Sequence, residues 1–167
     1  MEKPIIAITM GDAAGIGPEL ILKALALPQI YEACRPIVVG DPGLMHQTAQ
    51  ALGVRIGIDA VTSLAQAHSS PSQIAIIAPE ERWSGKIPWG ELEPRLGKLA
   101  ANCLEKAFQL AMTGEVQGVV SAPINKQGFH LAGYDYLDDL AYLAEFTQSP
   151  EPYVLGIAGE MSLEETE

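Results

Sequence analysis

The sequence is poor in several features that mark particular classes of protein. Its 167 residues include two cysteines, Cys34 and Cys103, far apart and outside any C-x-x-C pair, so we expect reduced, buried thiols. Lys and Arg number 10 against 21 Asp and Glu, and the net charge of −11 argues against nucleic acid or an anionic membrane as a partner. No apolar run approaches the roughly 18 residues of a membrane span, and no basic segment with a long apolar core begins the chain. These absences favour a cytoplasmic protein.

The composition is that of a folded globular protein, with 48% hydrophobic and 19% charged residues. No repeat or clear linker divides the chain, so we treat residues 1–167 as a single α/β unit. Alternating strands and helices around a mostly parallel sheet are expected. Apolar runs predict strands at 5–9, 35–40, 54–58, 74–78, 117–121 and 153–158. Periodicity and capping residues predict helices at about 18–27, 44–52 and 92–112, one after residue 125 and one from residue 138 or 139.

The sharpest signal is the stretch from residue 5 to residue 19, which predicts a buried strand, a glycine-rich turn and a helix start. Gly11, Gly15 and Gly17 allow positive φ or a close approach of the backbone to a ligand, and Pro18 suits a first helical turn. The turn would lie at the carboxyl end of a strand, where open α/β sheets bind ligands. Asp12 would repel a pyrophosphate and suits a hydroxyl, an amide or a cationic ring. The alternative is a plain strand-to-helix connection.

A second polar segment, Ser121-Ala122-Pro123-Ile124-Asn125-Lys126, follows the strand predicted at 117–121. Lys126 could bind a substrate phosphate or carboxylate, or polarise a carbonyl; it could equally be a solvated lysine at a helix start. Asn125 could cap that helix. Because both segments follow strands, we expect one cleft to hold them both. His46, His68 and His130 lie in unrelated segments without the spacing of metal ligands, so no metal site is predicted.

Two motifs resemble a known family, that of the 4-hydroxythreonine-4-phosphate dehydrogenases of vitamin B6 biosynthesis. Residues 9–19, TMGDAAGIGPE, resemble its T-x-G-D-P-A-G-I-G-P-E, and only Ala13 departs. Residues 121–126, SAPINK, resemble its [TS]-[GA]-P-[IV]-N-K. The resemblance covers nearly the whole chain but only the first half of the family's length. It implies one part of an isocitrate/isopropylmalate dehydrogenase-like fold, with the active site between two lobes of a homodimer.

The activity implied by the resemblance is an NAD-dependent oxidative decarboxylation of 4-hydroxythreonine 4-phosphate or a related phosphorylated hydroxy acid. Gly11, Asp12, Gly15 and Gly17 would then contact the cofactor, and Asn125, Lys126 and Asp139 the substrate; no catalytic residue is assigned. The family has G-H-T-E where this chain has Asp139 and Leu140, which replaces an imidazole by a carboxylate that repels phosphate.

The family also uses a divalent metal (zinc, magnesium or cobalt), held by histidines of its later half. We therefore expect this chain alone to be inactive. The competing interpretation is a truncated, non-catalytic paralogue or assembly module that keeps the α/β scaffold. A flavodoxin-like binding domain would need an acidic or aromatic nucleotide loop, which the sequence does not offer.

Overall fold

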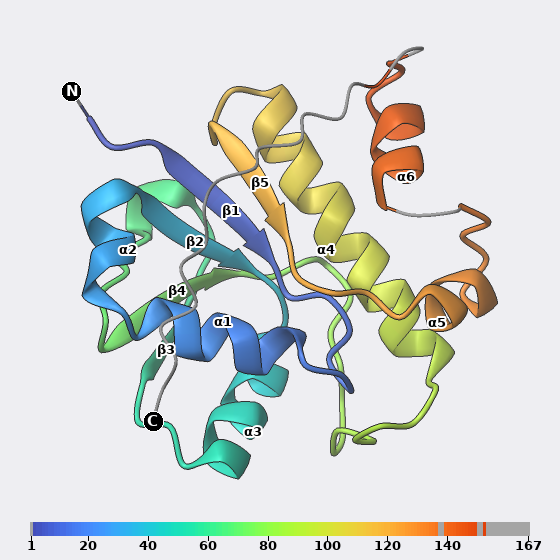
Figure 1. Ribbon diagram of the computed structural model, residues 1–167, viewed down its shortest axis with the longest axis horizontal. Helices are drawn as coiled ribbons and strands as arrows, with labels where there is room; N and C mark the ends of the chain where they lie inside the picture. Colours follow the sequence, from blue (N-terminus) through green and yellow to red (C-terminus); the bar gives the residue numbers. More distant parts are fainter. Residues whose placement is uncertain (1, 137–138, 150–151, 153–167) are drawn as a thin grey trace, which may run out of the picture.

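A five-stranded parallel sheet with helices on both faces forms the body of the protein (Figure 1). The computed structural model describes residues 2–136, 139–149 and 152, so the strand predicted at 153–158 and the acidic segment after it lie outside the described residues. The strands are β1 (Ile5–Thr9), β2 (Arg35–Val39), β3 (Gly57–Val61), β4 (Gln73–Ile77) and β5 (Gly118–Ser121). The helices are α1 (Gly17–Leu25), α2 (Pro28–Ala33), α3 (Pro42–Leu52), the short 3-10 helix η1 (Leu64–Gln66), α4 (Pro94–Met112), α5 (Lys126–Leu131) and α6 (Asp139–Phe146).

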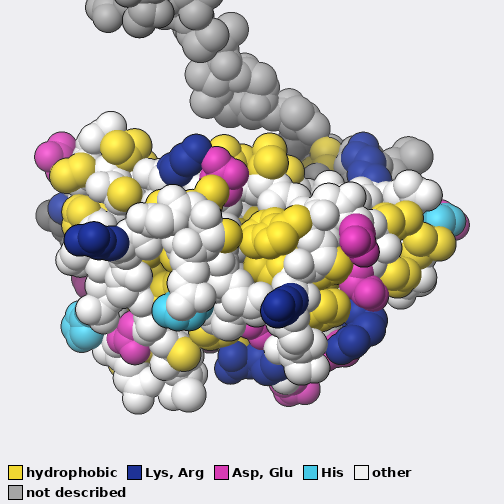
Figure 2. Space-filling view, turned by 90° about the horizontal axis from the view of Figure 1, so that it is seen from below, with side chains coloured by type: hydrophobic (Ala, Val, Ile, Leu, Met, Phe, Trp, Pro, Cys, Tyr) yellow, Lys and Arg dark blue, Asp and Glu magenta, His cyan; other side chains and the backbone are white. Residues whose placement is uncertain are grey.

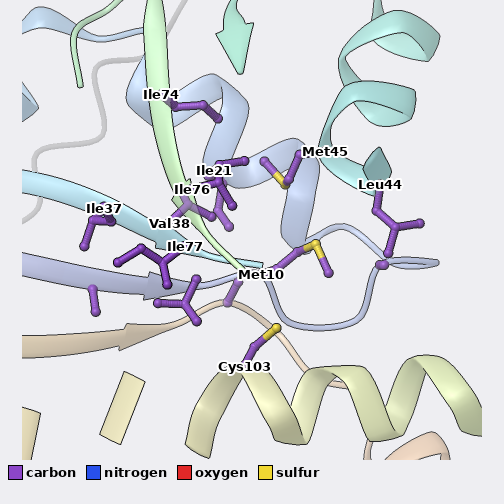
Figure 3. Packing of buried hydrophobic residues seen from close by; sticks show 14 of the residues in the cluster. Met10, Ile21, Ile37, Val38, Leu44, Met45, Ile74, Ile76, Ile77 and Cys103 are labelled. Atoms are coloured by element: carbon purple, nitrogen blue, oxygen red, sulfur yellow. The ribbon is translucent and has the colours of Figure 1, made fainter. Parts of the chain in front are cut away.

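The strand order is β3-β4-β2-β1-β5, and every ladder between neighbouring strands is parallel. The chain moves from β1 to β2 in one direction along the sheet and from β4 to β5 in the other. Right-handed crossovers therefore place α1 and α3 on one face and α4 on the opposite face, as Figures 1 and 3 show. The predicted α/β architecture around a parallel sheet is confirmed.

The core is built from the apolar runs of the strands and the inward stripes of these helices. Ile37, Val38, Ile74 and Ile76 are fully or almost fully buried, as in strands covered on both faces. Figure 3 shows Met10 in the centre of this core, with Cys103 of α4 on the other side of the sheet from α1 and α3. Burial raises the pKa of the Cys103 thiol far above its ordinary value, so this cysteine stays protonated and inert. Cys34, which was also expected to be buried, is only half-buried, because it lies directly before β2 rather than in the core.

Local capping explains several boundaries that the sequence predicted. The Asp41 carboxylate accepts a hydrogen bond from the Leu44 N–H at 2.9 Å and caps α3, and Asn125 caps α5 through the Gly128 N–H at 3.0 Å. Gly114 follows α4 with φ 74°, the left-handed conformation that commonly ends a helix. These bonds join residues close in sequence, so the sequence alone suffices to predict them.

Several boundaries differ from the prediction. The strand expected at 54–58 is β3, three residues further along, because the Val54 N–H bonds back to the Ala49 carbonyl of α3 at 2.9 Å and Gly53 adopts φ 67°. The first helix ends at Leu25 rather than Leu27, and Pro28 then begins α2, which was not predicted. The connection expected from 59 to 72 contains the end of β3 and the short helix η1.

A smaller aromatic cluster joins α4, α5 and α6 beside the main core. Its buried members are Ala101, Leu104, Phe108, Phe129 and Tyr142. The Tyr142 hydroxyl donates to the Glu105 carboxylate, and burial, reinforced by this hydrogen bond, raises the pKa of Tyr142. The helices α4 and α5 also meet where Gly97 faces Gly128: a Cβ on Gly97 would lie 2.1 Å from the Gly128 carbonyl oxygen. This contact sets the position of α5 and of the Asn125-Lys126 segment at its start.

Candidate functional site

The two polar segments singled out in the sequence lie side by side at the carboxyl edge of the sheet. The strands β1 and β5 are neighbours, with Thr9 opposite Ser121, so the turns that follow them leave the sheet together. The Asp12 N–H donates to the Pro123 carbonyl at 2.9 Å, and the Ala122 N–H donates to the Thr9 carbonyl at 3.2 Å. More than a hundred residues of sequence separate the two segments, and the backbone itself joins them.

Two glycines of the turn are required by this packing. Gly11 has φ 68°, and a Cβ there would lie 2.4 Å from the Pro123 carbonyl oxygen and 2.8 Å from that of Ala122. A Cβ on Gly17 would lie 2.4 Å from the Met10 carbonyl oxygen, where α1 begins against the end of β1. Distances this short exclude any side chain without movement of the backbone. Both glycines are therefore explained by the fold, whatever they do for a ligand.

The hydrogen bonds of the turn decide what it can offer to a ligand. The N–H groups of Asp12, Ala14 and Gly15 already donate within the chain, to Pro123 O, to Asp12 Oδ1 at 3.0 Å and to Asp12 O at 3.2 Å. These three donors do not form a cradle for a phosphate. The other carboxylate oxygen of Asp12, Oδ2, has no hydrogen-bond partner among the described residues, and Asp12 is half-buried. The turn thus presents an acceptor, which suits a hydroxyl or an amide N–H.

Gly15 lies beside that acceptor. The three atoms nearest to a Cβ there would all belong to Asp12, with Oδ2 closest at 3.2 Å. Its backbone is outside the left-handed region, so the absence of a side chain is required neither by φ nor by packing against another element. Of the three glycines of the turn, Gly15 is the one whose smallness leaves space next to the Asp12 carboxylate.

The second segment supplies an exposed cation. Lys126 is the first residue of α5 and is exposed, while Asn125 is half-buried and uses its side chain as the helix cap. Asp139 begins α6, but its side chain lies outside the described part of the chain, so its expected place beside the turn stays a prediction. A cleft that holds both segments also stays a prediction.

A buried hydroxyl stands directly before the turn. Thr9 is fully buried, and its Oγ1 has no hydrogen-bond partner among the described residues. Leaving such a group unpaired is unfavourable by about 1–3 kcal/mol. The sequence predicts Thr9 as the last residue of a strand and the first of the glycine motif, but its unpaired hydroxyl is not predicted, because β-branched residues are ordinary in strands.

Sequence reasoning missed a third segment at this edge. The loop between β4 and α4 returns to the glycine turn, where the Gly90 N–H donates to the Ala14 carbonyl at 3.0 Å. The same loop is held further back by Asp41, whose Oδ2 accepts from the Trp83 N–H at 3.1 Å. In Figure 1 this loop lies at the lower end of the molecule with α3. No local pattern in the loop indicates that it docks on the turn.

Exposed apolar side chains accompany this edge. Ile16, just before α1, and Leu20, within α1, are 58% and 46% exposed, and Trp89, next to Gly90, is 47% exposed. Figure 2 views the molecule from below and shows hydrophobic side chains in patches, with charged side chains between them.

Among the residues that the structure describes, no three His, Cys, Asp or Glu side chains are grouped so that they could hold a metal ion. His46 instead lies 3.0 Å from Gln50 on α3, and His130 lies 3.2 Å from Asp135. None of the described helices has the length and apolarity that crossing a membrane requires.

The comparisons with known proteins indicate one and the same family. The family described as pyridoxal phosphate biosynthetic protein PdxA matches residues 32–164, a range that includes the second polar segment and begins after the first. The 4-hydroxythreonine-4-phosphate dehydrogenase of Desulfosudis oleivorans is 36% identical over 157 residues, which cover 94% of this chain and 46% of the relative. The D-threonate 4-phosphate dehydrogenase of Salmonella typhimurium is 36% identical over 151 residues, 89% of this chain and 46% of the relative.

A solved structure agrees with these relatives. The crystal structure of a 4-hydroxythreonine-4-phosphate dehydrogenase from Burkholderia phymatum superposes with a TM-score of 0.86 at 32% identity, covering 90% of this chain and 46% of that one. The chain thus spans about half the length of the relatives it matches.

Proposed function

This chain belongs to the PdxA family of pyridoxal phosphate biosynthetic proteins, and from that membership we propose that it forms part of an NAD-dependent dehydrogenase. The substrate would be 4-hydroxythreonine 4-phosphate, or a related phosphorylated hydroxy acid such as D-threonate 4-phosphate. The family is one of dehydrogenases, and relatives of both names match nearly all of this chain. In this proposal the glycine turn of this chain faces the cofactor, and Lys126 supplies a positive charge that binds the substrate.

The observation that carries the proposal is the joining of the two family motifs at one edge. The hydrogen bond from the Asp12 N–H to the Pro123 carbonyl, and the contact of Gly11 with the same carbonyl, lock the segments into one unit. Carboxyl edges of parallel sheets are where α/β proteins bind ligands. Gly15 also keeps the space beside the unpaired Asp12 Oδ2 open, where a Cβ would approach that oxygen to 3.2 Å.

NAD, when bound, would accept the hydride removed from the substrate. Asp12 Oδ2 would accept a hydrogen bond from a hydroxyl or amide group of the dinucleotide, and Gly15 would let that group approach. The pyrophosphate is not placed on the turn, because three of its N–H groups already donate to partners within the chain. The remaining residues of the two segments would have a structural role: Gly11, Gly17 and the helix cap Asn125 would keep the segments in position and would not contact the ligand.

Lys126 would bind an anionic group of the substrate. Its ammonium is exposed at the start of α5, and the contact between Gly97 and Gly128 fixes that helix against α4. A lysine suits a phosphate as a point charge.

The metal expected from the family does not fit the residues described here, because no ligand group is assembled among them. In the longer proteins of the family the ligands would come from the other half, and the homodimer expected from the resemblance is likewise proposed for the whole protein only.

NADH binding tests the turn. The purified chain is titrated with NADH, with fluorescence as the readout, and Gly15→Val is expected to weaken binding by about tenfold or more, the effect of losing a hydrogen bond to a charged group. Gly57→Val is the matched control, because Gly57 lies in β3 with ordinary φ and its Cβ would meet its neighbours at 3.4 Å. Equal NADH affinity in the two variants would show that the turn is only a connection.

Activity tests the division of labour between the halves. The chain alone, with zinc, magnesium or manganese, is assayed for NAD reduction with phosphorylated hydroxythreonine and with threonate and erythronate phosphates. We expect no metal-dependent turnover but retained substrate binding, which Lys126→Met should weaken while Lys86→Met, in the loop before α4, should not. Turnover that a chelator abolishes would overturn the first expectation.

The competing proposal is a non-catalytic scaffold, which is favoured by the lack of a metal group among the described residues. It predicts that neither NADH nor the phosphorylated substrates bind saturably. The same two titrations therefore distinguish the proposals.

A further inference from the structure

A cavity lies at the opposite edge of the sheet from the two motifs, where β1 and β2 begin. Its volume is about 240 Å³, below the roughly 300–1,000 Å³ of sites for drug-sized ligands. Ile5, Ile37 and Leu64 give it an apolar lining, and Lys3 and Arg35 give it a polar one. It is thus sized for a small molecule that has both an apolar and an anionic part.

The charged side chains that line this cavity are basic. Lys3 and Arg35 line it together with His68, and no Asp or Glu does, although the chain has 21 acidic against 10 basic residues. The Lys3 ammonium donates to the Tyr31 carbonyl at 2.6 Å, which leaves two of its three protons for other acceptors. The Arg35 guanidinium lies 3.3 Å from the Glu2 carboxylate, whose side chain is 84% exposed. Such an exposed pair contributes only about 0–1 kcal/mol, so a ligand can replace Glu2.

The two remaining ionisable groups of the lining stay neutral. Burial, with the nearby Cys34, raises the pKa of Tyr31 to about 12. Burial also raises the pKa of the Cys34 thiol, although Lys3 acts in the opposite direction. The Tyr31 hydroxyl lies 2.8 Å from the carbonyl oxygens of both Leu25 and Ser70, which ties the α2 segment to the loop before β4. The cavity therefore has a fixed wall and no negative charge at neutral pH.

We propose that this cavity binds a small organic monocarboxylate, with the carboxylate between Lys3 and Arg35 and the apolar part against Ile5, Ile37 and Leu64. A guanidinium pairs with a carboxylate through two parallel hydrogen bonds, and the apolar lining selects against a bare inorganic anion. The site is separate from the proposed dehydrogenase site. In a parallel sheet all strands begin at one edge and end at the opposite edge, and the two sites lie at these two edges.

Benzoate is a suitable probe, titrated into the purified chain by calorimetry. Benzamide supplies the same ring without the charge, and inorganic phosphate supplies charge without the ring. We expect saturable binding of one benzoate, with benzamide and phosphate each weaker by about tenfold or more, as expected for loss of a hydrogen bond to a charged group or of the apolar contact. Equal binding of benzamide, tighter binding of phosphate, or no saturable binding of benzoate would overturn the proposal.

Variants locate the site. Arg35→Gln and Lys3→Met should each weaken benzoate binding by about tenfold, whereas Glu2→Gln should tighten it by up to about fivefold, because it removes the competing carboxylate. Arg55→Gln changes the charge equally at an exposed position that does not line the cavity and should leave the affinity unchanged. NADH titration of the same variants should match the wild-type chain, which separates this site from the proposed function. Wild-type benzoate affinity in both Arg35→Gln and Lys3→Met would refute the assignment.

Discussion

The contact between the glycine turn and Pro123 can be tested through the stability of Gly11→Ala. This substitution introduces two penalties at once. Gly11 has φ 68°, and a non-glycine residue in that region is destabilised by about 1–2 kcal/mol. Its Cβ would also lie 2.4 Å from the Pro123 carbonyl oxygen, and relieving such overpacking typically costs about 1–3 kcal/mol. We expect the free energy of unfolding to fall by about 3 kcal/mol, a large part of the roughly 5–15 kcal/mol of an ordinary domain.

Two other glycines separate these penalties. Gly53 has nearly the same φ, 67°, but a Cβ there would meet nothing within 4 Å, so Gly53→Ala measures the conformational penalty alone, about 1–2 kcal/mol. Gly17 is outside the left-handed region, but its Cβ would lie 2.4 Å from the Met10 carbonyl oxygen. Gly17→Ala therefore measures a steric penalty of about 1–3 kcal/mol, reduced by up to about 1 kcal/mol because alanine favours the helix.

Urea unfolding followed by circular dichroism measures all three variants. The midpoint should shift with little change in the dependence of the free energy on urea, since the surface exposed on unfolding stays the same. If Gly11→Ala loses no more stability than Gly53→Ala, then the turn is not held against Pro123 in solution and the joining of the two motifs is wrong.

Three further predictions concern two contacts of α4 and α3 and one half-buried phenol at the opposite edge of the sheet. Gly97→Ala should lower the free energy of unfolding by about 2–3 kcal/mol, measured by urea unfolding, because its Cβ would lie 2.1 Å from the Gly128 carbonyl oxygen; an unchanged midpoint would contradict the close packing of α4 on α5. Asp41→Ala should lower it by about 2–3 kcal/mol, since it removes both the cap of α3 and the acceptor of the Trp83 N–H, and proteolysis should then cut the loop before α4 faster. Stability should fall as pH rises from about 10, the ordinary phenol pKa, towards 12, because the raised pKa of Tyr31 keeps the folded phenol protonated after the unfolded one has ionised. The pH dependence of urea unfolding should be shallower in Tyr31→Phe, and an identical slope would contradict the shift.

The sequence by itself determined the elements and their order. The apolar runs at β2 and β4 are buried beyond their first residue, because a strand covered on both faces needs apolar side chains on both. β1, which the sequence also predicts to be buried, is fully buried only at Ala7 and Thr9. The sequence also suffices to predict the ends of helices, such as the caps Asp41 and Asn125 and the terminator Gly114, because each bonds to residues close to it in the chain. The family motifs likewise pointed to the relatives that comparison then found.

Predicted boundaries were less accurate where the same local pattern is compatible with two structures. The residues after Gly53 are apolar enough to begin a strand, yet Val54 bonds back to α3 instead, and pairing with β4 then sets the start of β3 at Gly57. The helix α2 was missed because its six residues include no buried side chain and hence no apolar period.

Only the tertiary structure decided what lies against what. That Gly11 meets Pro123, that Gly97 meets Gly128 and that Gly90 returns to Ala14 depends on the neighbour that each strand takes and on the face that each helix covers. The cavity between Lys3 and Arg35 depends on the same choices at the opposite edge. Such contacts join residues tens to more than a hundred positions apart, and no capping rule or hydrophobic period acts over that distance; the burial of the whole sheet between α1, α3 and α4 selects them together.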